Sequence, residues 1–139
     1  MSTGTPELSG SPLRILVAED VSIVACTLRE ILDGLGAEVV GPVGTVEGAL
    51  DLVIADERPL DGALLDVDLG GESVFPVAEA LRYKGCPFVF LTGYGREETA
   101  DAYDDVPVVT KPCGVADLAR VVASFRRLGS GKQQHQDLA

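Results

Sequence analysis

Two carboxylates, a hydroxyl and an ammonium each follow a short apolar run in this sequence: Asp20, Asp66, Thr92 and Lys111. Because helix-length segments separate the runs, they are typical of buried parallel strands. Ligands of an open parallel sheet bind at the carboxyl ends of its strands, so we expect these four side chains to meet at one edge. Such a set suits a divalent cation and a phosphoryl group.

An acidic pair forms the cation-binding part of this set. Glu19 directly precedes Asp20, and adjacent acids at a strand end are costly to bury unless a cation lies between them. Mg²⁺ prefers a few carboxylate oxygens, with water and phosphate oxygens completing an octahedron. We therefore expect Asp20 and Asp66 to be direct ligands and Glu19 to act through water.

The other groups suit phosphoryl transfer. A carboxylate is a known nucleophile that forms an acyl phosphate. The transferred group carries charge on three oxygens, which a metal, a fixed cation and a hydrogen-bond donor neutralise. Lys111 and Thr92 are donors of the required types.

Strand and helix patterns alternate along the chain that must position these residues. Apolar runs predict strands over 13–18, 38–41, 62–65, 88–91 and 107–110. Helical spacing predicts helices over about 22–35, 45–58, 73–83, 96–103 and 115–128. Five strands alternating with five helices imply right-handed βαβ units, so we expect a doubly wound α/β sandwich with a five-stranded parallel sheet and helices on both faces.

The 139 residues fit one domain, which we place at 13–128. Residues 1–12 are rich in Gly, Ser, Thr and Pro and should be a disordered tail, and 129–139 should be a flexible tail. The start of the chain lacks the basic and apolar parts of a secretion signal.

Composition excludes some classes of partner. The net charge of −11 argues against nucleic acid, and no apolar run reaches the ~18 residues of a membrane span. The three cysteines are far apart and odd in number, which favours reduced thiols packed in the core of a cytoplasmic protein.

Glu19-Asp20, Asp66, Thr92 and Lys111-Pro112 resemble, in type and order, the receiver domain of a bacterial two-component response regulator of the CheY-like superfamily. The resemblance implies strand order 2-1-3-4-5. It makes Asp66 the phospho-acceptor, with Thr92 and Lys111 as phosphoryl ligands. It assigns Mg²⁺ to Glu19, Asp20, Asp66 and the backbone carbonyl of Asp68, and it implies a cis Lys111-Pro112 bond.

A second similarity narrows the subfamily. Residues 87–94 resemble the Phe-Ala-Thr-Gly-Tyr motif of some stand-alone alphaproteobacterial receivers, with Leu91 replacing the usual Ala. Those receivers work with histidine kinases of the HWE and HisKA_2 types, so the resemblance implies such a kinase as partner.

One position departs from the family pattern. Many receivers have an aromatic switch residue three positions before the lysine, and here that position is Val108. Tyr94 is our alternative switch candidate, and we expect Tyr103 to be a partly exposed packing residue. Our hypothesis is that residues 93–105 become ordered on phosphorylation.

Two other functions compete with this interpretation. Asp66-Val67-Asp68 resembles the first motif of haloacid-dehalogenase-like phosphatases, but that motif normally lies on the first strand. A receiver-like binding module that never takes phosphate is the other. The same residues fit a calcium loop poorly, because Gly70 stands where the fifth position needs an acid.

We therefore expect a single-domain response regulator that accepts a phosphoryl group from a histidine kinase or a phosphotransfer protein onto Asp66. It is not expected to turn over a metabolite, beyond its own phosphorylation and dephosphorylation. Output through protein contacts, and self-association through the last helix where many receivers dimerise, complete the expectation.

Overall fold

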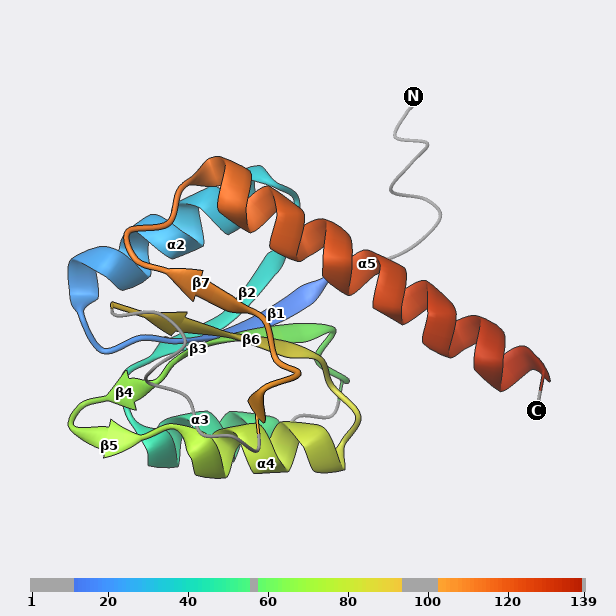
Figure 1. Cartoon of the computed structure of the whole chain (residues 1–139), viewed down its shortest axis with the longest axis horizontal. Coiled ribbons are helices and arrows are strands. Elements are labelled where there is room, and N and C mark those ends of the chain that lie inside the picture. Colours follow the sequence, from blue (N-terminus) through green and yellow to red (C-terminus); the bar gives the residue numbers. More distant parts are fainter. Residues whose placement is uncertain (1–11, 56–57, 94–102, 139) are drawn as a thin grey trace.

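A parallel sheet forms the middle layer of the computed structural model, which describes residues 12–55, 58–93 and 103–138. Its strands run in the order β2-β1-β3-β6-β7 (Figure 1). Their bounds are Arg14–Ala18 (β1), Glu38–Val43 (β2), Gly62–Asp66 (β3), Phe88–Thr92 (β6) and Val108–Thr110 (β7). Since β6 and β7 are the fourth and fifth strands of this sheet, the predicted order 2-1-3-4-5 is confirmed.

Helices cover both faces of the sheet, as predicted (Figure 1). On one face lie α2 (Ser22–Gly34) and α5 (Val115–Leu138), and on the other lie α3 (Val46–Ala55) and α4 (Phe75–Tyr83). The helices of each layer pack against the sheet, and each layer encloses a separate apolar core. Every residue of β3 and β6 is buried, as expected for strands covered on both faces.

The helix α5 lies very close to the strand β3. A Cβ atom built on Gly62 would stand 2.3 Å from Cδ2 of Phe125, so the ring occupies the space that a side chain at position 62 would fill. Phe125 is 1% exposed. The missing side chain at Gly62 therefore allows this helix to pack against the middle of the sheet.

A short hairpin after β3 was not predicted. It pairs β4 (Asp68–Leu69) with β5 (Glu72–Ser73), and Gly70 and Gly71 turn the chain with φ of +63° and +87°. The third predicted helix consequently begins at Phe75 rather than near residue 73.

The last helix is longer than predicted, since its predicted range ended at residue 128. The helix α5 continues to Leu138 and projects past the sheet (Figure 1). Extending an existing helix adds one hydrogen bond per residue without a new nucleation step, which offsets the glycine cost of roughly 1 kcal/mol at each of Gly129 and Gly131.

Some expectations fall outside the described residues: the tail at 1–11, Tyr94, and most of the predicted helix at 96–103. Among the cysteines, Cys86 is buried as expected, whereas Cys26 is exposed on α2 and Cys113 is half-buried. No helix within 12–55, 58–93 and 103–138 is long and apolar enough to span a membrane.

Candidate functional site

The carboxyl ends of four strands bring the predicted residues to one edge of the sheet. Glu19 and Asp20 follow β1, Asp66 ends β3, Thr92 ends β6 and Lys111 follows β7. The ammonium of Lys111 donates hydrogen bonds to Oδ2 of Asp66 at 3.0 Å and to Oε1 of Glu19 at 3.2 Å. Residues separated by 92 positions in the sequence thus share one charged cluster.

Glu19 is the most deeply buried charged group of this cluster, at 2% exposure. Its Oε2 accepts a hydrogen bond from the Val21 N–H at 3.0 Å, and its own N–H donates to the Val43 carbonyl at 2.9 Å. Burial raises the pKa of Glu19 and the neighbouring Asp66 adds to the rise, although the Val21 N–H and Lys111 oppose it. The carboxylate is therefore held rigidly in a place where its charge needs a cation.

Lys111 supplies part of that positive charge. Burial alone lowers the pKa of its ammonium, but the hydrogen bonds and charges of Asp66 and Glu19 outweigh burial and raise it. Its backbone N–H donates to the Thr92 carbonyl at 2.7 Å, and the Lys111-Pro112 bond is cis, as the resemblance implies.

Three carboxylates lie close enough to share a metal ion. Oxygen atoms of Glu19, Asp20 and Asp66 all fall within 4.8 Å of one another, and Asp20 is the exposed member. The ammonium of Lys111 offsets only one of the three carboxylate charges, so the cluster keeps a net negative charge. Hard carboxylate oxygens with an open, water-facing side fit Mg²⁺.

The loop after β2 is a neighbour that sequence reasoning missed. A Cβ atom on Gly44 would stand 3.3 Å from Cα of Asp20, and the preceding Val43 binds the Glu19 N–H. The loop therefore packs tightly against the acidic pair. The pattern of a glycine after a strand was visible, but nothing in it indicated which strand end it would approach.

Asp68 is the first residue of the hairpin, and its side chain stabilises the turn of that hairpin. Its Oδ1 accepts from the Gly71 N–H at 3.1 Å, and its own N–H donates to Oδ1 of Asp66 at 3.2 Å. The carboxylate of Asp66 is thus held by backbone on one oxygen and by Lys111 on the other.

Thr92 is fully buried at the end of β6, opposite Thr110 in the register of β7. Val108, the position of the family's aromatic switch, is half-buried and packs on the α3–α4 side of the sheet. Tyr103 was expected to be partly exposed, and this was wrong. It is 4% exposed, because its ring lies among other aromatic rings beneath β6.

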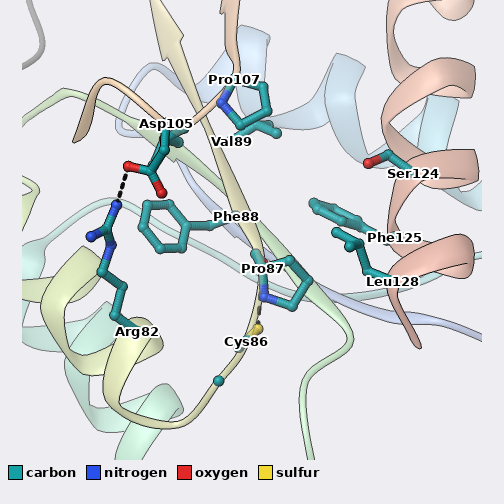
Figure 2. Close-up of a pocket in the computed structure, with 12 residues that line it drawn as sticks. Arg82, Cys86, Pro87, Phe88, Val89, Asp105, Pro107, Ser124, Phe125 and Leu128 are labelled. Carbon is teal, nitrogen blue, oxygen red and sulfur yellow. Dashed lines mark hydrogen bonds and ion pairs between the residues drawn. The ribbon is translucent and has the colours of Figure 1, made fainter. Parts of the chain in front are cut away.

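Two of the cavities among the described residues lie at opposite ends of the strands. Beside the site, a groove of about 400 Å³ runs between α2 and the Lys111–Cys113 segment, and its Ile23 is 75% exposed. At the far end, a cavity of about 380 Å³ lies between β6, α4 and α5. Figure 2 shows that second cavity, with the Arg82–Asp105 ion pair on one side and Phe125 on the other.

Comparisons by sequence and by structure found known proteins that are similar to this chain. SdrG from Sphingomonas melonis Fr1 is 38% identical, with a TM-score of 0.72 over 84% of this chain and 98% of that chain. SdrG has also been solved in a BeF3-activated conformation. The PhyR response regulator REC domain of Erythrobacter litoralis is 26% identical, with a TM-score of 0.71 over 83% of this chain and 90% of that chain.

Among curated proteins, the phyllosphere-induced regulator PhyR of Methylorubrum extorquens is 28% identical over 87% of this chain and 47% of its own length. The chain spans about half the length of the curated relatives it matches. No family model matches the sequence.

Proposed function

The chain belongs to the receiver family of response regulators, and on that premise we propose that Asp66 accepts a phosphoryl group from a histidine kinase with Mg²⁺ bound. One observation carries the proposal. Lys111 joins the buried carboxylates of Asp66 and Glu19, and the exposed Asp20 adds a third carboxylate to the cluster. A nucleophile, a fixed cation and a set of metal ligands are then adjacent.

Glu19, Asp20 and Asp66 would hold the ion, together with the backbone carbonyl of Asp68. When bound, Mg²⁺ neutralises charge on the phosphoryl oxygens. The hydrogen bond from the Asp68 N–H holds one oxygen of Asp66 in place. The ion pair with Lys111 holds the other oxygen of this carboxylate.

In the transfer, a carboxylate oxygen of Asp66 attacks phosphorus and the bond from phosphorus to the donor nitrogen breaks. The electron pair of that bond stays on the donor imidazole, and the product is an aspartyl phosphate. Lys111 and Thr92 donate hydrogen bonds to the phosphoryl oxygens. Lys111 already donates a hydrogen bond to the Asp66 carboxylate, so its ammonium needs only a small shift to reach the transferred phosphoryl group.

The groove beside Lys111 is the proposed docking place of the phosphoryl donor. It is lined by apolar side chains of α2, including Ile23, and it adjoins the reacting carboxylate through Lys111. The donor is a histidine kinase, of the HWE or HisKA_2 type by the motif at 87–94, or a phosphotransfer protein. Output through protein contacts, a homodimer through α5 and a cytoplasmic location complete the proposal.

Incubation with Mg²⁺ and acetyl phosphate, followed by intact mass measurement, tests the proposal. We expect the gain of one phosphoryl group in the native chain and none in Asp66→Asn or in the presence of EDTA. Absence of any adduct would favour a binding module that never takes phosphate. Rapid turnover of small phosphate esters would instead favour a phosphatase.

A further inference from the structure

Aromatic side chains gather on the α4 side of β6. The chain has four Phe and three Tyr, and four of these rings form one cluster: Phe75, Phe88, Phe90 and Tyr103. Tyr103 lies in its centre. Its ring stacks on Phe75 at 5.0 Å and meets Phe90 edge-on at 5.5 Å and 89°.

Polar groups of α4 hold the Tyr103 ring in this place. Its hydroxyl donates a hydrogen bond to the Glu79 carboxylate, and the Arg82 guanidinium lies 4.9 Å from its ring centroid. Arg82 also forms an ion pair with Asp105, at 2.6 Å. Figure 2 shows this ion pair. Burial and the charge of Glu79 raise the pKa of Tyr103 to about 12, so the phenol remains a donor at neutral pH.

The same ring contacts β6, the strand that carries Thr92, and the first residue of α4. Phe90 and Thr92 lie two residues apart on β6 and therefore face the same side of the sheet. Phe75 is the first residue of α4, the helix that follows the loop after Asp66. A hydrogen bond of 3.0 Å from the Val74 N–H to the Val67 carbonyl joins the two ends of that loop.

Close packing gives these contacts a consequence for the site. Interiors of proteins have few voids, so a ring in contact with Phe90 limits how far this part of β6 can shift. Thr92 is fully buried at the end of that strand. Val108, which packs on the same core, supplies no ring of its own.

We propose that Tyr103 is a positioning residue for phosphoryl transfer: its ring, held on α4 by Glu79 and Arg82, supports Phe90 and thereby fixes the Thr92 hydroxyl. The inference rests on the proposed function, because the hydroxyl matters as a ligand of the phosphoryl group on Asp66. A displacement of about 1 Å in such a donor costs up to about a hundredfold in rate.

The test compares Tyr103→Leu, which removes the ring, with Tyr103→Phe, which keeps it. Tyr83→Leu is the matched control, because Tyr83 lies on α4, the helix of Glu79 and Arg82, and is 93% exposed. The readouts are the rate of aspartyl phosphate formation at saturating acetyl phosphate and the NMR shift of the Thr92 methyl group. Mg²⁺ affinity is measured alongside, because its proposed ligands lie on other strands.

We expect Tyr103→Leu to move the Thr92 methyl resonance and to slow phosphorylation by roughly threefold to tenfold, with Mg²⁺ affinity unchanged. Tyr103→Phe should restore most of the rate, and the control should match the native chain. A folded Tyr103→Leu with the native Thr92 resonance and the native rate would overturn the inference.

Glu79→Ala covers the case in which Tyr103→Leu does not fold. Glu79 is exposed, and its removal frees the phenol while the ring remains. A smaller shift of the same Thr92 resonance supports the inference, and an unmoved resonance contradicts it. If the native chain takes no phosphoryl group at all, the proposed function fails, whereas the Thr92 resonance still decides whether Tyr103 positions this residue.

Discussion

Lys111 is the residue on which the charge balance of the site depends. Its side chain is 23% exposed and is shared between two carboxylates of which one, Glu19, has no exposed side-chain surface. Removing one partner of a buried ion pair leaves the remaining charge without compensation, which is costlier than the pair is worth. The two acids are therefore tolerable next to each other only with a cation in reach.

Lys111→Met should consequently destabilise the chain by about 1–3 kcal/mol in urea unfolding without metal. Added Mg²⁺ should recover part of the loss, because it restores positive charge beside the same carboxylates. Lys84→Met, at an exposed position after α4, serves as the control and should change little. Equal stability of the Lys111 and Lys84 variants would contradict this role.

Tyr103 should give the chain a pH dependence at the alkaline end. Its pKa is raised from the ordinary value of 10.0 to about 12, so the folded state holds the phenolic proton more tightly than the unfolded state. The contribution is fully present below pH 10 and is lost as the pH rises toward 12. A shift of this size corresponds to at most about 3 kcal/mol.

The difference in unfolding free energy between the native chain and Tyr103→Phe isolates this effect from other alkaline titrations. We expect that difference to shrink between pH 9 and pH 12. A difference that stays constant over the range would show that the phenol keeps its ordinary pKa.

Among the elements, the packing of α5 against the sheet depends on Gly62, the first residue of β3. The Phe125 ring fills the space over Gly62, so Gly62→Ala forces the ring out of its place. We expect a loss of about 1–3 kcal/mol in urea unfolding, the usual cost of overpacking a core. Gly34→Ala is the contrast, because nothing lies within 4 Å of its Cβ position at the end of α2, and it should be neutral or slightly stabilising.

The helix α2 presents Ile23 to the groove beside Lys111. Ile23→Lys should reduce phosphotransfer from the host's histidine kinases by about tenfold, because a charge replaces an apolar contact at the proposed docking place. Phosphorylation by acetyl phosphate should be unchanged. Ile54→Lys is the control, because Ile54 is 65% exposed and lies on the opposite side of the sheet. An equal loss of phosphorylation rate with the kinase and with acetyl phosphate would show that Ile23→Lys impairs the chemical step and not docking.

For the molecule as a whole, apolar runs and their order were enough to predict the sheet. Buried parallel strands are apolar on both faces, so β1, β3 and β6 are plain in the sequence, and the residues after them necessarily meet at one edge. The position of Glu19, Asp66 and Lys111 in one cluster follows from this rule alone.

The features that were not predicted depend on contacts between distant residues. The burial of Tyr103 requires Phe75 and Phe90, and the approach of Gly44 to Asp20 requires the register of β2 on β1. Neither leaves a local pattern. The hairpin after Asp66 is too short for periodicity to reveal, and glycines at 129 and 131 indicated a helix end that the structure does not have.

The central claim is that the phosphoryl group resides on Asp66. Borohydride reduction of the chain after treatment with acetyl phosphate and Mg²⁺ converts an aspartyl phosphate to homoserine, which peptide mass mapping then locates. We predict homoserine at position 66 alone, and none when Mg²⁺ is omitted. Reduction at another residue, or an unreduced chain in every condition, would contradict the account.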